Sequence, residues 1–147
     1  MKEDQGLRAW SRLLGAHALA VRAVEDRLKS AGLPPLGWYD VLLELDRAGG
    51  RLRIGELAQS VVIEPYNMTR LLDRLEAEKL LTRERVVGDR RGAFAVLTEQ
   101  GAELRRRMWP HYRRAILNVF AAPLSEREAD AMAKSLTKVI VHLGRRT

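Results

Sequence analysis

The side chains with the most specific chemistry in this 147-residue sequence are polar and basic, and their spacing suits nucleic acid. Tyr66, Asn67, Arg70 and Arg74 follow one another closely, with Arg74 one helical turn beyond Arg70. Side chains three and four residues apart share one side of a helix. Asparagine and arginine can make bidentate contacts with adenine and guanine edges in the major groove. We therefore interpret this segment as a reading helix.

A second basic group lies in a short loop, Gly-Asp-Arg-Arg-Gly, at residues 88–92. Two glycines that bracket polar residues between β-like runs indicate a hairpin loop. Arg90 and Arg91 at the tip of such a loop suit a narrow, electronegative minor groove. Each feature alone has a plain alternative, namely a surface turn for the loop and a solvated helix face for the helix. On that face Arg70 and Arg74 would pair with neighbouring carboxylates, which are Asp73, Glu76 and Glu78.

The elements that must position these residues are mostly helical. Apolar residues from Leu7 to Leu28 recur every three or four positions, which predicts a long helix that ends before Pro34 and Pro35. A second helix follows and is broken at residues 48–50, and helical spacing returns at 54–61. Pro65 suits the first turn of the next helix.

Short β-like runs at 81–87 and 93–97 flank the loop and predict a hairpin. Thr98 is a plausible N-cap for a long helix, and Ser125 with Glu128 forms a capping box for the last one. The fold class is therefore mainly α with a small β-hairpin wing, a winged helix-turn-helix flanked by long N- and C-terminal dimerisation helices. The apolar stripes on the terminal helices favour a symmetric dimer.

Four segments resemble the MarR family of bacterial regulators. They are Ala-Gly-Gly-Arg-Leu-Arg-Ile-Gly-Glu-Leu-Ala at 48–58, Asn-Met-Thr-Arg-Leu-Leu-Asp-Arg-Leu-Glu at 67–76, Gly-Asp-Arg-Arg-Gly at 88–92 and Val-Leu-Thr-Glu-Gln-Gly at 96–101. The resemblance implies one domain over 1–147, with a winged DNA-binding lobe at 36–98 and dimerisation helices at 7–30 and 99–144.

The resemblance also implies a homodimer that reads an inverted repeat in double-stranded DNA. Carried over by position, Tyr66, Asn67, Thr69 and Arg70 lie at or near bases and phosphates, together with Arg74. Asp89 braces Arg91 at the wing tip beside Arg90, and Arg53 contacts a phosphate. These residues are the predicted DNA-binding set.

Many members of this family release DNA when a small aromatic acid binds. The residues that we expect to line such an effector site are Trp10, His17, Trp38, Tyr39 and His111, with Arg12 or Arg113 to neutralise the acid. The alternative places the tryptophans in the core or the dimer interface, and makes His17 an interface histidine that can render the dimer pH-sensitive. The sequence has no cysteine, which excludes a sensor based on thiol oxidation.

The predicted function is a DNA-binding transcriptional regulator, a repressor, with no cofactor. The net charge of +7 and the pI near 10.4 agree with a polyanionic partner. Catalysis is not expected, because the three histidines lack metal-ligand spacing and no phosphate-binding glycine loop or nucleophile elbow is present. No signal peptide or membrane span is found, so we expect a cytoplasmic protein. A winged-helix module that docks a protein instead of DNA is the alternative.

Overall fold

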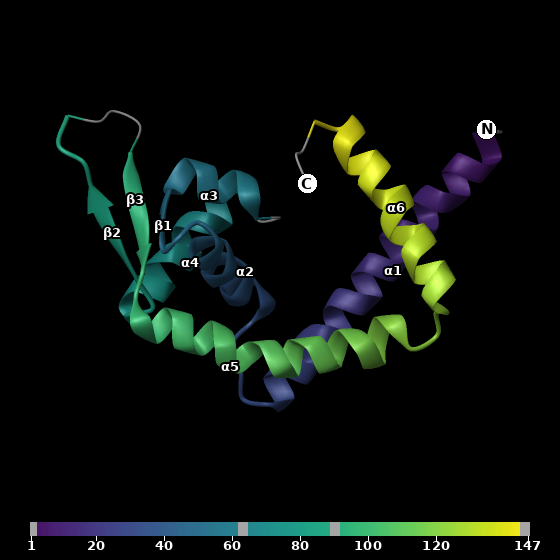
Figure 1. Cartoon of the computed structure of the whole chain (residues 1–147), viewed down its shortest axis with the longest axis horizontal. Coiled ribbons are helices and arrows are strands. Elements are labelled where there is room, and N and C mark those ends of the chain that lie inside the picture. The colour runs from purple at the N-terminus through teal and green to yellow at the C-terminus, as the bar shows by residue number, and fades with distance from the viewer. Residues whose placement is uncertain (1–2, 62–64, 89–91, 145–147) are drawn as a thin grey trace. The chain divides into compact units, whose positions relative to one another are not determined.

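The computed structural model describes residues 3–61, 65–88 and 92–144, with only the backbone at 65 and 66 (Figure 1). In these residues the elements follow the order α1 (Glu3–Ser30), α2 (Leu36–Arg47), β1 (Arg51–Arg53), α3 (Ile54–Ser60), α4 (Pro65–Ala77), β2 (Leu81–Arg85), β3 (Ala93–Leu97), α5 (Glu99–Ile116), the π-helix η1 (Leu117–Ala121) and α6 (Glu126–His142). The chain divides into two compact units. One comprises residues 25–112, and the other comprises residues 1–24 with 113–147.

The unit of residues 25–112 is a winged helix-turn-helix with a continuous apolar core. Helices α2, α3 and α4 each bury one face, as their apolar periodicity predicts, and α5 adds a buried methionine. The fully buried large side chains of this unit are Leu28, Val41, Leu42, Leu45, Leu57, Leu72, Leu75, Leu81 and Met108. This core holds α4 with its polar residues outward.

The sheet has three antiparallel strands in the order β1-β3-β2. The predicted hairpin is present, with Arg83 of β2 opposite Ala95 of β3. Strand β1 was not predicted. It pairs with β3 across more than 40 residues of sequence, with Leu52 opposite Ala95. Its three residues, Arg-Leu-Arg, contain a single apolar side chain, which is too little for a periodicity signal.

The turn between α4 and β2 is fastened to the first turn of α5. The Thr98 hydroxyl donates to the Lys79 carbonyl at 2.7 Å and accepts the Gly101 N–H at 3.1 Å, which confirms the predicted N-cap. The Thr98 N–H donates to the Leu80 carbonyl at 3.1 Å. Gly101 has no room for a Cβ, because one would overlap the Leu80 carbonyl. The first turn of α5 therefore meets the turn after α4 backbone to backbone.

The second unit consists of the first part of α1, the end of α5, η1 and α6. Ser125 and Glu128 make the predicted capping box, in which the Glu128 carboxylate accepts the Ser125 N–H at 2.8 Å. Many large apolar side chains of this unit face solvent in a single chain. Those at least half exposed are Leu7, Trp10, Leu14, Leu19, Val141 and Leu143. The stripes predicted from sequence are thus only partly covered within one chain.

Candidate nucleic-acid interface

Helix α4 has a buried face and an exposed polar surface. Met68, Leu72 and Leu75 are buried against the core. Asn67, Thr69, Arg70 and Arg74 are all exposed, as a reading helix requires. The spacing places Asn67, Arg70 and Arg74 on one side of the exposed surface, and Thr69 and Asp73 on the other. The predicted α4 residues with described side chains are therefore accessible to a large partner.

The carboxylates of α4 pair with an arginine from the hairpin. Arg83 of β2 donates through Nη2 to Asp73 Oδ1 at 2.7 Å and through Nε to Glu76 Oε2 at 3.1 Å. Both carboxylates raise the pKa of the Arg83 guanidinium further above its ordinary value. Among the described residues, Arg70 and Arg74 form no ion pair with Asp73 or Glu76. In the alternative interpretation, a solvated helix face, these carboxylates would pair with Arg70 and Arg74. In the structure they pair with Arg83 instead.

Arg53 lies directly before α3, on an arginine-rich face of the sheet. Its guanidinium carbon is 4.6 Å from the centre of the Phe94 ring, and that of Arg51 is 3.6 Å from the same centre. Arg51 also pairs with Glu84 at 3.6 Å. A guanidinium over an aromatic face is held there by the electron density of the ring. Sequence reasoning found Arg53 but missed Arg51 and Phe94, because their contact depends on the unpredicted strand β1.

Part of the predicted DNA-binding set lies outside the described residues. These are the side chain of Tyr66 and the wing-tip residues Asp89, Arg90 and Arg91. The described glycines on either side of the tip, Gly88 and Gly92, have φ of +85° and +97°. Such angles favour glycine and suit a tight hairpin connection.

Trp38 of the predicted effector set lines a pocket of about 400 Å³ within the winged unit. Its polar lining groups come from the turn after α4 and from the first turns of α5, and they are Glu78, Gln100, Glu103 and Arg107. An indole face beside one guanidinium and two carboxylates can hold a planar ligand that carries both an acid and a hydroxyl group. Arg107, Gln100 and Glu103 were not among the predicted effector residues.

The other predicted effector residues are dispersed. Tyr39 is 3% exposed, and its ring stacks on that of Trp109 with the centroids 6.2 Å apart. The Tyr112 ring packs against Tyr39 at an angle of 59°, with the centroids 5.0 Å apart. His111 is exposed on α5, and Trp10 is exposed on α1. Tyr39 is thus packed among aromatic rings within the core of its unit.

His17 lines an apolar groove of about 450 Å³ in the unit of the terminal helices. The groove runs between α1 and the segment of η1 and α6, and its lining includes Arg12, Leu13, Phe120, Met132 and Leu136. Arg12 and His17 are the ionisable side chains among its lining residues. The groove continues the exposed apolar surface of these helices, which suits a protein partner as well as a ligand.

An acidic cluster lies where α1, α2 and α5 meet in the winged unit. The Glu25 carboxylate accepts the N–H of Leu36 at 2.8 Å, which caps the start of α2. Burial, and then the charges of Glu44 and Glu25, raise the pKa of Asp40 to about 6. Burial and the Asp40 charge also raise the pKa of the Tyr112 phenol.

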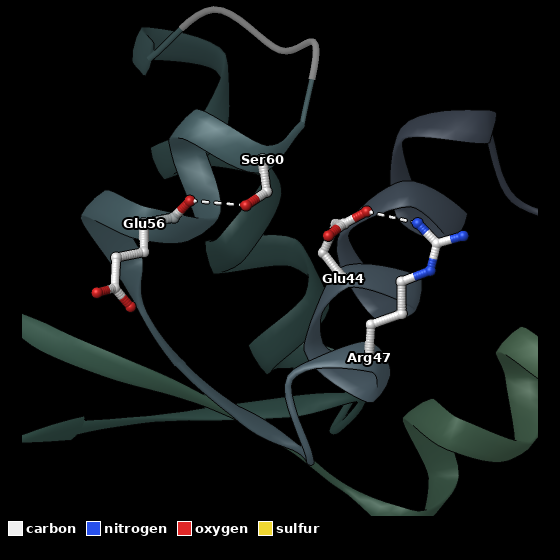
Figure 2. A network of polar contacts seen from close by, with 4 residues as sticks. All are labelled: Glu44, Arg47, Glu56 and Ser60. Carbon is white, nitrogen blue, oxygen red and sulfur yellow. Dashed lines mark hydrogen bonds and ion pairs between the residues drawn. The ribbon is translucent and has the colours of Figure 1, made fainter. Parts of the chain in front are cut away.

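Local contacts at the surface of the helix-turn-helix hold the ends of α2 and α3. Arg47 donates to Glu44 at 3.3 Å in the last turn of α2 (Figure 2). In the last turn of α3 the Ser60 hydroxyl donates to the Glu56 carbonyl at 3.0 Å (Figure 2). Exposed pairs of this kind contribute less than about 1 kcal/mol each. The core therefore dominates the placement of the two helices.

Two other kinds of site find no support in the described part of the chain. Residues 3–61, 65–88 and 92–144 contain no group of three or more histidine, aspartate or glutamate side chains placed to hold a metal ion. None of the helices in these segments combines the length and the apolar character needed to cross a membrane.

The winged lobe matches a model of the MarR family over residues 31–92. AbsC, a MarR family transcriptional regulator from Streptomyces coelicolor, is 30% identical, and the comparison covers 97% of each chain with a TM-score of 0.81. A second MarR family regulator of Streptomyces coelicolor, solved in complex with DNA, is 25% identical with a TM-score of 0.83. There the comparison covers 99% of this chain and 91% of that one.

The HTH-type transcriptional regulator YkoM of Bacillus subtilis is 29% identical to this chain over 101 residues. That match spans 69% of this chain and 65% of YkoM, which is less than two thirds of its length. The likeness to AbsC extends over both units, so it includes the terminal helices as well as the winged lobe. The chain therefore belongs to the MarR family of DNA-binding transcriptional regulators.

Proposed function

We propose that two copies of this chain bind an inverted-repeat operator in double-stranded DNA and repress transcription in the cytoplasm. The observation that carries the proposal is the surface of α4. Asn67, Arg70 and Arg74 are exposed along one side, while Asp73 and Glu76 pair with Arg83. A helix with this surface can enter the major groove and read base edges.

The wing tip and the residues near the sugar-phosphate backbone complete the proposed interface. We assign Arg90 and Arg91 to the minor groove, with Asp89 bracing Arg91, from their place in the hairpin loop. Arg53 and Thr69 are assigned to phosphates and Tyr66 to bases or phosphates. That a Streptomyces coelicolor relative at 25% identity was solved in complex with DNA supports DNA as the partner of this lobe.

The terminal helices at 7–30 and 99–144 are the proposed dimer interface. Leu7, Trp10 and Leu14 of α1 are 61%, 60% and 51% exposed in the single chain. Contiguous apolar surface of this extent is usually covered by a partner in a soluble protein. A second copy is the proposed partner, because members of the family bind DNA as dimers and a twofold dimer matches an inverted repeat.

A hydroxylated aromatic acid is the proposed effector, and the Trp38 pocket is its proposed site. Its carboxylate would pair with Arg107, and its hydroxyl would donate to Glu78 or Glu103. His17 and Trp10 belong to the terminal-helix unit, and we assign them to the dimer interface. Quenching of tryptophan fluorescence on titration with a small set of hydroxybenzoates, lost in both Trp38→Phe and Arg107→Met, tests this assignment.

The proposed function is tested by selecting a random duplex library on the purified protein and sequencing the retained DNA. Enrichment of an inverted repeat, with half-site centres about one helical turn apart, is the expected result. Affinity for that repeat should fall steeply with salt, by roughly 0.9 log units per log unit of salt for each phosphate contact. No enrichment at low salt from folded protein would overturn the proposal in favour of a protein-docking module.

A further inference from the structure

The ion pairs of Arg83 join the two parts of the winged unit that face DNA in the proposed function. Arg83 is carried by β2 of the hairpin, and Asp73 and Glu76 are carried by α4. The Arg83 side chain is 31% exposed, so the cluster lies at the rim of the core. Leu81, two residues earlier on the same strand, is fully buried. The hairpin is therefore joined to α4 by a core contact and by a charged contact beyond it.

The geometry of the charged contact constrains an angle as well as a distance. Two neighbouring donors of one planar guanidinium are used, Nη2 toward Asp73 at 2.7 Å and Nε toward Glu76 at 3.1 Å. The two carboxylates are three residues apart, one turn along α4. A planar guanidinium that binds two carboxylates on one helix resists rotation of its strand about the buried Leu81 contact. A lysine ammonium, a single point charge, would not.

Electrostatics alone gives no reason for carboxylates on a DNA-reading helix. Asp73 and Glu76 bring two negative charges and Arg83 one positive charge, so the cluster carries a net negative charge toward a polyanion. We propose that Arg83, Asp73 and Glu76 form a clamp that fixes the hairpin at one angle to α4, so that helix and hairpin engage DNA together. This inference rests on the proposed function, and Arg83 is in it a positioning residue.

The clamp and simple electrostatics predict opposite effects of removing a carboxylate. Asp73→Asn and Glu76→Gln each remove one negative charge, which by charge alone should tighten binding to any DNA. If the clamp positions the hairpin, affinity for the selected operator should instead fall on the order of tenfold, the scale of one specific contact. Affinity for random DNA should stay the same or rise. Tighter operator binding by both variants would overturn the clamp.

Two further variants separate position from charge. Arg83→Lys keeps every charge but loses the planar guanidinium, so operator affinity should fall while the salt dependence of binding stays unchanged. Glu99→Gln makes the same charge change at the exposed start of α5, outside both the clamp and the proposed effector pocket, and it should not lower operator affinity. A fall in Glu99→Gln equal to that in Glu76→Gln would contradict the proposal.

A distance measurement tests the clamp without DNA, and so independently of the proposed function. Because the sequence has no cysteine, cysteines introduced at Ala77 and Val87 take spin labels selectively. Both positions are exposed, one at the end of α4 and one just after β2. In protein diluted with unlabelled chain, Arg83→Lys should broaden the distance distribution between the labels. An unchanged distribution in the folded variant would overturn the clamp even if operator binding were lost.

Discussion

Gly101→Ala should destabilise the winged unit, because α5 approaches the turn after α4 more closely here than a side chain allows. A Cβ at Gly101 would overlap the Leu80 carbonyl oxygen and lie 2.8 Å from Leu97 Cδ1. The Leu80 oxygen belongs to the backbone and already accepts the Thr98 N–H at 3.1 Å. The clash can therefore be relieved only if α5 and the turn move apart.

The size of the effect follows from three terms. Overpacking a tight contact costs about 1–3 kcal/mol. Separation would also weaken the two hydrogen bonds from Thr98 to the turn, which contribute about 1 kcal/mol each. The better helix propensity of alanine returns only about 1 kcal/mol. The cost of the clash and of the weakened hydrogen bonds exceeds the gain in helix propensity, so the free energy of unfolding should fall by about 2–4 kcal/mol.

The assay is urea denaturation followed by circular dichroism, at one fixed protein concentration because dimerisation contributes to apparent stability. Gly55→Ala is the matched control, since Gly55 is also in a helix and a Cβ there meets nothing within 4 Å. That variant should be unchanged or more stable by up to about 1 kcal/mol. A loss of less than about 0.5 kcal/mol in Gly101→Ala, which is ordinary for a surface change, would refute the reasoning.

Three other substitutions test the partly buried carboxyl group of Asp40, the proposed minor-groove contact of Arg91 and the proposed dimer interface at Leu14. Asp40 has a folded-state pKa of about 6 against 3.8 ordinarily, so its protonated form favours folding, and this contribution is lost as the pH rises through 6. Asp40→Asn should therefore add about 1–2 kcal/mol of stability at pH 7.5, after a discount for partial exposure, and nothing below pH 3.8 in pH-dependent denaturation. Arg91→Ala should weaken operator binding by about 1–3 kcal/mol in a fluorescence anisotropy titration, and unaltered affinity would contradict the minor-groove assignment. Leu14, 51% exposed in the single chain, should be needed for dimerisation, so Leu14→Glu should raise the dimer dissociation constant at least about tenfold in analytical ultracentrifugation. A dimer as tight as the wild type would place the interface elsewhere.

The parts of the fold that sequence predicted were those set by local rules. Thr98 and Ser125 were recognised as caps because a cap depends on residues within one turn, and both caps are present. The hairpin followed from two short runs separated by a glycine-bracketed loop. The comparisons confirm the fold class and the assignment as a regulator rather than an enzyme.

What sequence could not predict depends on pairing between distant residues. Strand β1 exists because β3, far along the chain, lies beside it, and its own three residues carry no pattern. Arg83 is adjacent in sequence to Glu84 but seven residues from Glu76, so no spacing rule singles out Asp73 and Glu76 as its partners. Sequence analysis placed Tyr39 in an effector site and gave no sign of its stacking on Trp109, which is 70 residues away in the sequence. The DNA and effector assignments of individual residues remain predictions.

The contacts around α4 also suggest where a ligand would act on DNA binding. The C-terminal end of α4 is tied to α5 by the Thr98 hydrogen bonds and the close approach at Gly101. The proposed effector pocket is lined on one side by Glu78 and Leu80 and on the other by α5 residues up to Arg107. A ligand there touches both sides of the same junction. It can shift α4 only if it binds one spacing of α5 and the turn better than another. The backbones of α5 and the turn are already in close contact at Gly101. A small change in the distance between them must therefore move α4, and the clamped hairpin must move with it.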